Sequence, residues 1–516
     1  MKRRIDGAEP TTSRNQRASA LGRVRFALAL LPALLAACGG GGGGNDPPLG
    51  DGAQVCAPTN PYRADAVAPT RTGSLSDEKA WVASYMDAAY LWYSEIPSVN
   101  ANDPAYSNTG DVYTSLDSYF NALLTRSVTG SGAAKDRFSF TYPTKAWNDL
   151  AGSGVVSGYG IEWYWDSPTP PRGIRVAYTE PGSPAALAGV QRGDRLVTAD
   201  GVSSEAGDSN GVATLNAAMF PGANGQSHSF SFDRHGFTLN ANLVSANVTK
   251  KPVYFQVIHD CCSKTGHIVF NDHIATAEQG LIEAITAFKA TGIDGLVVDL
   301  RYNGGGYLYI ASELAYMIAG PTRTAGKTFE RLVYNDKRSG ENEIMPFRSE
   351  SCFLDSNFSC TNVQPLPTLN LSRVTVITTG SSCSASEAFI NGLRGIDVEV
   401  TVVGDTTCGK PYGFTAKDNC GISYFPIEFK GENAKGFSDY PDGFAATCPA
   451  VDDFSMALDH PSEGMLSAAL YSARHDGACD PVAAQAARRS QLAAGPQAQP
   501  RLLRGPEREN RILLRR

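Results

Sequence analysis

The order of a serine, a helical pattern, a strand pattern and a lysine within residues 380–414 constrains this chain more than any other stretch. Apolar residues recur at helical spacing over residues 386–393, and Ser384 precedes them where a hydroxyl can cap a helix. The valines of residues 398–403 then predict a buried strand. A glycine-flanked turn follows and carries Lys410, so the serine and the lysine can meet.

This order suits nucleophilic chemistry. A serine at a helix N-terminus lies beside unpaired backbone N–H groups that stabilise a developing oxyanion. A lysine becomes a general base when burial lowers its pKa, and the neighbours that could bury Lys410 are Val402, Pro411, Tyr412 and Phe414. The alternative is that Ser384 only caps a helix and Lys410 is only solvated.

A second stretch supports the first. The short apolar run GLVVDL at residues 295–300 is typical of a strand buried in a parallel sheet, and it leads into Arg301-Tyr302-Asn303 and three glycines at 304–306. Consecutive glycines allow positive φ and close backbone approach, so their N–H groups can face a ligand oxygen. Helical spacing returns over residues 307–318.

Three motifs together resemble the carboxy-terminal processing (tail-specific) serine protease family with a PDZ domain. They are SASE at 384–387, the Gly409-Lys410 pair, and DLRYNGGG at 299–306. The resemblance implies that Ser384 is the nucleophile and Lys410 its base. It also implies an oxyanion site formed by the backbone N–H groups of Ala385 and of Gly305 or Gly306.

Other candidates remain beside this assignment. Ser382 and Ser386 are competing nucleophiles, and Cys383 is a rival cysteine nucleophile. Many members of the family carry a glutamine four residues after the lysine, where it orients the base, and this chain has Phe414 there. Either another polar group positions Lys410, or the dyad works without an orienting residue.

The chain of 516 residues is long enough for about three domains, and its 42% hydrophobic and 19% charged residues are those of a globular protein. We expect an α/β fold: a crotonase-like/ClpP-like serine protease core with an inserted PDZ-like β-rich domain and a small N-terminal helical region. The expected segments are a signal peptide with lipobox at 1–38, a flexible tether at 39–74, the helical region at 75–150, the PDZ-like domain at 151–250, the catalytic domain at 251–480 and a disordered basic tail at 481–516.

The PDZ resemblance rests on GSPAALAGVQRGDRLVTADG at residues 182–201. Such domains add a peptide as a strand and hold its carboxylate with backbone N–H groups, here those of Gly158, Tyr159, Gly160 and Ile161. The alternative is a domain that acts only as a lid or spacer.

The N-terminus predicts export. Arginines precede an apolar run at residues 26–36, and Leu35-Ala36-Ala37-Cys38 matches a bacterial lipobox. We expect Cys38 to be lipidated and the chain to lie on the periplasmic side of a bacterial membrane. The lack of aspartate directly after Cys38 favours the outer membrane over the inner one. A plain secretory signal is the alternative.

Cysteine usage agrees with export, because ten of the 11 cysteines remain when Cys38 is set aside. Cys352 and Cys360 can close a small loop, and a bridge between Cys383 and Cys408 could brace the site. Cys261 and Cys262 with two nearby histidines could suggest a metal, but a second ligand pair is missing, so we expect disulfides or buried thiols. We expect structural roles for His267, His273 and His460, and no metal or other cofactor.

The sequence thus predicts an exported serine endopeptidase that cleaves extended or C-terminally exposed protein substrates through a Ser/Lys dyad. Its expected partners are protein or peptide substrates and a membrane bound through the lipid anchor, and the sequence defines no oligomeric state. A net charge of −7 argues against nucleic acid. The alternatives are a non-catalytic peptide-binding lipoprotein that retains the fold, and acyl transfer on a non-peptide substrate.

Overall fold

A six-stranded sheet forms the centre of the protein, seen here in a computed structural model that describes residues 52–355, 359–493 and 501–503. The predicted signal peptide and Cys38 lie outside the described residues. The first two strands form an antiparallel hairpin, and the others run parallel. In spatial order the strands are β12 (Val253–His259), β13 (Lys264–Phe270), β14 (Gly295–Asp299), β19 (Arg373–Thr378), β20 (Glu399–Gly404) and β25 (Cys448–Pro449).

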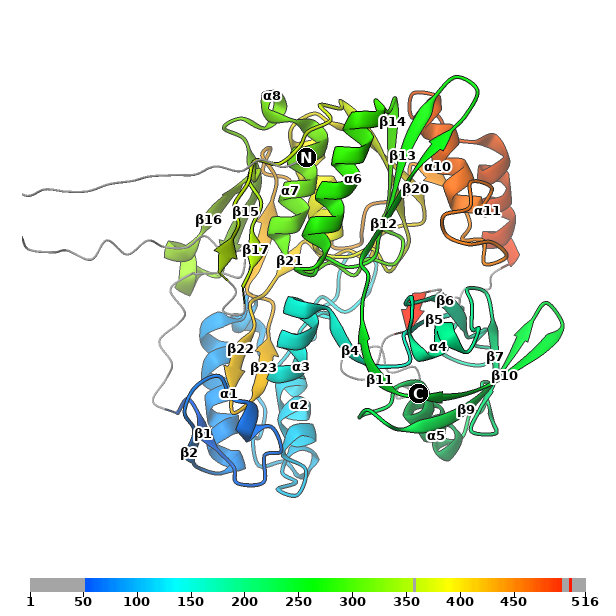
Figure 1. The fold of residues 1–516 in the computed structure, drawn as a ribbon. Coiled ribbons are helices and arrows are strands. Elements are labelled where there is room, and N and C mark those ends of the chain that lie inside the picture. Colours follow the sequence, from blue (N-terminus) through cyan, green and yellow to red (C-terminus); the bar gives the residue numbers. More distant parts are fainter. Residues whose placement is uncertain (1–51, 356–358, 494–500, 504–516) are drawn as a thin grey trace, which may run out of the picture. The chain divides into compact units, whose positions relative to one another are not determined.

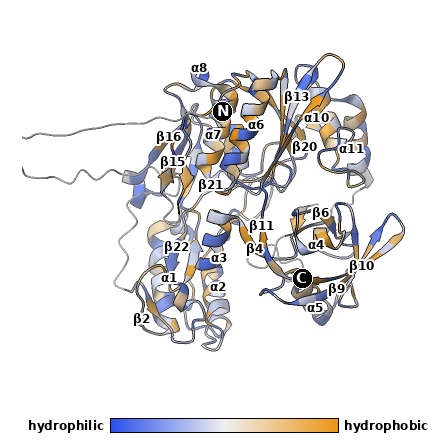
Figure 2. Ribbon diagram, viewed as in Figure 1, coloured by the Kyte–Doolittle hydropathy of each residue, from blue (hydrophilic) through white to orange (hydrophobic). Residues whose placement is uncertain are grey.

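Helices cover both faces of this sheet (Figure 1). Val298 of β14 packs in one cluster with α6 (Ala277–Thr291), α7 (Leu308–Ala319) and α9 (Ala385–Gly395). Its neighbour Val297 points to the opposite face, because side chains alternate along a strand, and packs with α10 (Gly464–Arg474). Figure 2 shows the hydrophobic and hydrophilic residues of α6 side by side, as expected of a helix with one buried face.

The carboxyl ends of three neighbouring parallel strands lead into the segments that the sequence singled out. β14 runs into the glycines at 304–306, β19 into Ser384, and β20 into Lys410. Since parallel strands end at the same edge of a sheet, the topology brings these segments together, as in other open α/β sheets.

Two smaller sheets and the N-terminal helices flank this edge. The helices α1 (Leu75–Ala89) and α2 (Val112–Ala122) lie where the sequence predicted them and share a core with residues of β23. One sheet consists of β22 (Lys417–Asn419), β23 (Ile422–Phe425) and β3 (Phe140–Pro143). The other consists of β16 (Glu343–Pro346), β15 (Thr328–Tyr334), β24 (Phe429–Glu432) and β21 (Tyr412–Gly413). Short elements in this part of the chain are η1 (Arg63–Asp65), η2 (Tyr93–Glu95), η3 (Pro104–Tyr106), α3 (Thr144–Asn148), η4 (Asp149–Ser153), α8 (Pro321–Thr324) and η5 (Asp336–Glu341).

A separate β-rich unit has its own hydrophobic cluster, which contains Trp163 and Phe232. Within the PDZ-like motif at residues 182–201, Pro184–Leu187 form the short helix α4, and Asp200-Gly201 form the turn that joins β7 to β8. In spatial order its strands are β10 (Phe237–Val244), β9 (Ser227–Arg234), β7 (Arg195–Ala199), β6 (Arg175–Thr179), β5 (Ile161–Trp165) and β26 (Arg501–Leu503), with β8 (Val202–Ser203) beside β7. The unit also holds α5 (Ser209–Met219), and the strands β4 (Val155–Gly158) and β11 (Ala246–Thr249) pair with each other.

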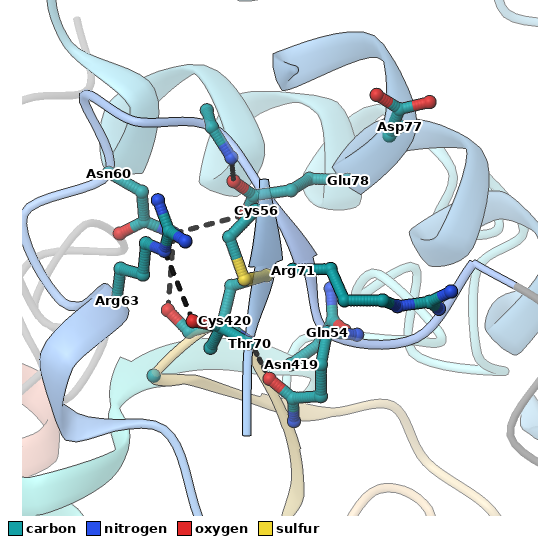
Figure 3. Close-up of a disulfide and its surroundings, with 12 residues drawn as sticks. Gln54, Cys56, Asn60, Arg63, Thr70, Arg71, Asp77, Glu78, Asn419 and Cys420 are labelled. Carbon is teal, nitrogen blue, oxygen red and sulfur yellow. Dashed lines mark hydrogen bonds between the residues drawn. A yellow bond between two sulfur atoms is a disulfide. The ribbon is translucent and has the colours of Figure 1, made fainter. Parts of the chain in front are cut away.

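The prediction of a flexible tether as far as residue 74 is wrong for residues 52–74. Here β1 (Val55–Cys56) pairs with β2 (Arg71–Thr72), and Cys56 forms a disulfide with Cys420 (Figure 3). Buried Gln54 adds hydrogen bonds to Asn419 and Cys420. The local sequence of residues 52–74 is polar and rich in proline, and it does not indicate a disulfide to a cysteine 364 residues away.

The prediction of a disordered tail from residue 481 is also wrong where the structure describes it. Residues Pro481–Ala493 form α11, because an alanine-rich stretch has high helix propensity and proline is favoured at a helix start. The Cys448–Cys479 disulfide precedes this helix. Beyond it, β26 pairs with β5.

The expected pairs Cys352–Cys360 and Cys383–Cys408 are both disulfides, and β17 (Phe353–Leu354) and β18 (Cys360–Thr361) lie within the first loop. The prediction for Cys261 and Cys262 is wrong, because both thiols are free and exposed at the turn of the β12–β13 hairpin. Within the described ranges, no helix has the length and apolar character needed to cross a membrane.

Candidate active site

The glycine turn and Ser384 lie in direct contact. A Cβ atom added to Gly305 would lie 2.7 Å from the Ser384 Cβ and 2.9 Å from the Ala385 nitrogen. Gly305 also has a φ of +97°, which disfavours any other residue. Glycine at this position therefore allows the turn after β14 to approach the start of α9.

Ser384 and Lys410 line the same cavity, which has a volume of about 520 Å³. Only 8% of the Lys410 surface is exposed, and Ser384 is half-buried. The cavity thus brings together the two residues that the resemblance assigned as nucleophile and base. Other residues of its wall include Asp272, His273, Gly304, Gly305, Gly306, Glu330, Ala388, Phe414 and Tyr440.

Ser384 has a strained backbone. Its φ of 56° and ψ of −114° lie outside the regions that L-residues favour, at the point where the chain enters α9. Strain of this kind costs about 1–3 kcal/mol and is concentrated at functional sites. The conformation places Ser384 at a sharp turn from loop to helix.

The two competing serines have structural partners. The Ser382 hydroxyl donates to the Leu300 carbonyl at 2.7 Å, and the Ser386 hydroxyl donates to the Asn303 carbonyl at 3.0 Å. Both residues are fully buried, whereas Ser384 borders the cavity. The geometry therefore favours Ser384 among the three serines. Cys383 is in a disulfide, which removes the free thiol that a cysteine nucleophile needs.

The buried carboxylate of Glu387 joins the serine segment to the lysine segment. It accepts backbone N–H groups from Ser384 at 3.0 Å, from Gly409 at 2.8 Å and from Lys410 at 2.8 Å. The Thr407 hydroxyl donates to it at 2.5 Å. Burial raises the pKa of Glu387, and these donors oppose the rise. The sequence gives no signal for these bonds, because the contacts of Glu387 with residues 407–410 span some twenty residues.

The side chain of Lys410 faces aromatic rings. Its Nζ lies 4.1 Å from the centroid of the Phe414 ring and 5.3 Å from that of Phe138. The residue at the position of the expected orienting glutamine thus contacts the lysine, but through a ring face and not through a hydrogen-bonding group. A ring face attracts the ammonium form of lysine.

Asn303 organises the glycine turn. Its side-chain oxygen accepts the Gly305 N–H at 2.9 Å and contacts the His273 Nδ1 at 2.9 Å, and its side-chain nitrogen donates to the Phe270 carbonyl at 2.9 Å. The Gly305 N–H is thus directed at Asn303 and not at the cavity. Among the described residues, the backbone N–H groups of Gly306 and Ala385 have no hydrogen-bond acceptor, so these two remain the candidate oxyanion donors.

The three histidines considered from the sequence are His267, His273 and His460; the first two are buried and the third is exposed. Burial lowers the pKa of His273 to about 4 and that of His267 to about 3, so both rings are neutral near pH 7. His460 is exposed, and its Nδ1 accepts the Ser462 N–H. His273 lines the cavity, but its Nδ1 is occupied by Asn303.

The predicted peptide-carboxylate loop lies between β4 and β5. The carbonyls of Tyr159 and Gly160 accept N–H groups from Ala185 and Glu180, at 3.0 and 2.8 Å. Within the described part of the chain, the N–H groups of Tyr159 and Gly160 have no hydrogen-bond acceptor. Gly158 pairs with Ala246 of β11, and Ile161 pairs with Thr179 of β6.

One group of potential metal ligands occurs in the described ranges, formed by Cys383, Glu387 and Cys408. Because the two cysteines share a disulfide, neither can supply the thiolate that binds a metal. Glu387 is saturated with hydrogen bonds.

An α/β core of this strand order, joined to a PDZ-like unit and with a strained serine and a buried lysine on the wall of one cavity, is the arrangement expected of a serine peptidase. Residues 264–417 match the model of peptidase family S41, residues 77–140 that of the S41 N-terminal domain, and residues 175–213 that of a PDZ domain. By these matches the chain carries a peptidase family S41 region together with the S41 N-terminal domain and a PDZ domain. S41 peptidases are serine-type proteases.

Relatives agree with this assignment. A carboxyl-terminal-processing protease of Picosynechococcus is 25% identical over 261 residues, which are 50% of this chain and 55% of the relative. A carboxyl-terminal-processing protease of Synechocystis is 26% identical over 267 residues, which are 50% of this chain and 54% of the relative. This chain thus spans about half the length of these relatives.

A solved structure shows the same fold. The crystal structure of a protein assigned to the S41 proteases of Bacteroides fragilis has a TM-score of 0.58 and 23% identity to this chain. The match covers 78% of this chain and 98% of the other. It supports the crotonase-like core with its PDZ domain and N-terminal helical region.

Proposed function

We propose that this protein is an exported serine endopeptidase in which Ser384 and Lys410 form the catalytic dyad. The observation that carries the proposal is that these two residues border one cavity while Glu387 accepts hydrogen bonds from the backbones of both. Cys383 directly precedes Ser384, and Cys408 lies two residues before Lys410. The disulfide between them therefore links the two catalytic segments covalently.

In the proposed reaction, the Ser384 Oγ attacks the carbonyl carbon of an extended peptide while uncharged Lys410 accepts the hydroxyl proton. The N–H groups of Ala385 and Gly306 stabilise the negative charge on the carbonyl oxygen. Lys410 then gives its proton to the leaving amine, and water hydrolyses the acyl-enzyme. The PDZ-like domain would hold substrates with exposed C-termini through the N–H groups at Gly158 to Ile161.

We propose that Cys38 is lipidated and that the protein acts on the periplasmic side of a bacterial membrane, with the outer membrane favoured. The lipobox residues Leu35 to Cys38 and the disulfides support this proposal. Protein or peptide substrates are the proposed partners.

Degradation of an unstructured protein by wild type, Ser384→Ala and Lys410→Ala tests the dyad. We expect both variants to lose proteolysis, and Ser386→Ala, a serine two residues away with only a backbone partner, to retain it. A fluorophosphonate probe that labels Ser384 in wild type, located by peptide mass spectrometry, would identify the nucleophile. Proteolysis that survives Ser384→Ala would refute the proposal.

The second candidate function is a non-catalytic peptide-binding lipoprotein. The contact between the Lys410 Nζ and the Phe414 ring, 4.1 Å from its centroid, favours this second function. A ring face stabilises the charged form of lysine, and charged lysine cannot act as a base. It predicts peptide affinity without proteolysis in wild type and in every variant.

A further inference from the structure

The strand β26 occupies the edge of the PDZ-like sheet to which a peptide would add. Its residues Arg501–Leu503 pair antiparallel with β5, and β5 would otherwise be the edge strand of this sheet (Figure 1). The predicted carboxylate loop directly precedes β5. PDZ domains bind extended peptides as an added strand. The chain therefore covers its own candidate peptide-binding edge.

The two leucines of β26 point to opposite sides, as expected of a strand. Leu503 is 1% exposed and belongs to the cluster of the PDZ-like unit with Trp163 of β5 and Leu215 and Met219 of α5. Leu502 is 3% exposed. An isolated three-residue strand is held by such burial more than by its few backbone bonds.

Leu502 faces the catalytic domain. It shares a cluster with Tyr164 of β5 and with Tyr302, which directly precedes Asn303 of the glycine turn. Its backbone N–H donates to the Ser381 hydroxyl at 2.9 Å, three residues before Ser384. Since this N–H points away from β5, the bonds between the strands fall on residues 501 and 503. The segment thus contacts the PDZ-like edge, the residue before the glycine turn and the loop that leads to Ser384.

We propose that residues Arg501–Leu503 are a built-in ligand of the PDZ-like domain, and that this edge selects extended peptides with two successive large apolar residues. One such residue fills the position of Leu503, and the next one toward the N-terminus fills the position of Leu502. An external peptide or substrate binds there only after it displaces the chain's own segment. The effect on proteolysis rests on the proposed function, whereas the binding does not.

A tethered ligand competes at an effective concentration that reaches the millimolar range. Releasing it should therefore raise the affinity for an external peptide by about tenfold or more. The test uses the full chain with Ser384→Ala, so that cleavage does not disturb the measurement. The probe is a fluorescein-labelled peptide with the sequence Pro-Arg-Leu-Leu-Arg-Gly of residues 500–505.

The probe should bind the variant with Leu502→Ser and Leu503→Ser at least about tenfold more tightly than the unaltered chain. A peptide with serines in place of both leucines should not bind. The matched control is Val482→Ser, an apolar residue of α11 that is 74% exposed and should leave the affinity unchanged. Equal affinity in the released and unaltered chains, or no binding to the released chain, would overturn the proposal.

Hydrogen exchange provides a second readout that separates release from misfolding. The backbone amides of Trp163 and Trp165, opposite Leu503 and Arg501, should exchange faster in the released variant, and the unlabelled peptide should restore slow exchange. Fast exchange that the peptide does not reverse would also overturn it. With Ser384 restored, the released variant should cleave substrates that contain Leu-Leu faster than the unaltered chain does. If no variant shows proteolysis but the peptide still binds, the proposed protease activity is refuted and the built-in ligand is not.

Discussion

The Glu387 carboxylate accepts the backbone N–H of Lys410 at 2.8 Å, although Glu387 lies in α9 and Lys410 in the loop between β20 and β21. The same carboxylate accepts the N–H of Ser384 at 3.0 Å. One buried side chain therefore fixes the backbones that carry both proposed catalytic groups.

Replacing Glu387 should impair both stability and activity. Glu387→Ala leaves buried N–H groups of Ser384, Gly409 and Lys410 without an acceptor, and each costs about 1–3 kcal/mol. We expect the free energy of unfolding to fall by about 3 kcal/mol or more and kcat/KM on an unstructured protein to fall more than about tenfold. Glu387→Gln, which keeps one acceptor, should lose less of both. Wild-type kcat/KM in Glu387→Ala would contradict the positioning role.

Removing the aromatic ring beneath Lys410 should favour its uncharged form. The Phe414 ring centroid lies 4.1 Å from the Lys410 Nζ, and such a contact is worth about 0.5–2 kcal/mol to the charged lysine. We expect Phe414→Gln to move the acid limb of the pH–rate profile to lower pH and to raise kcat near neutral pH. Phe414→Leu separates loss of the ring from gain of a polar group. A profile unchanged in both variants would show that the ring does not oppose catalysis.

The Cys383–Cys408 disulfide should support the site. It spans 25 residues, and closure of a loop of that size is worth about 3 kcal/mol. The double variant Cys383→Ser with Cys408→Ser should lower the thermal midpoint and kcat together. The matched control, Cys448→Ser with Cys479→Ser, removes a bridge of 31 residues that touches neither proposed catalytic residue, and it should lower the midpoint alone. Equal losses of kcat in the two double variants would refute the claim that the Cys383–Cys408 disulfide supports the active site in particular.

The buried Glu330 should make stability depend on pH. Burial raises its pKa from 4.5 to about 8. Since the folded state keeps this acid protonated, the stability that it contributes is complete below pH 4.5 and is lost as pH rises toward 8. Glu330→Gln, which stays neutral, should flatten that part of the profile and stabilise the protein most at pH 8 and above. Urea unfolding of both proteins at pH 5 and pH 8.5 measures this; equal differences at the two values would refute it.

Cys38 should carry the membrane anchor. In a bacterial host, wild type should incorporate a labelled fatty acid and sediment with membranes, because stable anchoring requires more than one acyl chain. Cys38→Ser should lose the label and appear in the soluble fraction. Label retained in Cys38→Ser would place the acyl group elsewhere or exclude lipidation at this cysteine.

The sequence predicted most of the core because its signals are local. The run at Gly295–Asp299, the helical spacing over residues 307–318 and the order of Ser384, helix, strand and Lys410 each follow from short periodic patterns. The roles of Ser384 and Lys410 came from the family resemblance, and the cavity that both residues line agrees with it.

What the sequence missed depends on contacts between distant residues. The acceptors of the Gly305 and Lys410 N–H groups are Asn303 and Glu387, and neither motif indicates such a partner. The exposed thiol of Cys261 escaped notice because an even number of cysteines suggested full pairing. Composition also concealed β26, since its two leucines lie within a basic and proline-containing segment.

The disulfide between Cys56 and Cys420 closes a covalent ring, because the two cysteines stand 364 residues apart. The ring encloses Ser384 and Lys410. If a protease cuts an exposed loop inside the ring, both fragments stay attached, and a gel separates them only after the disulfide is reduced. Proteolytic nicking inside the ring therefore adds the mass of one water to the chain, but it does not separate the fragments on a non-reducing gel.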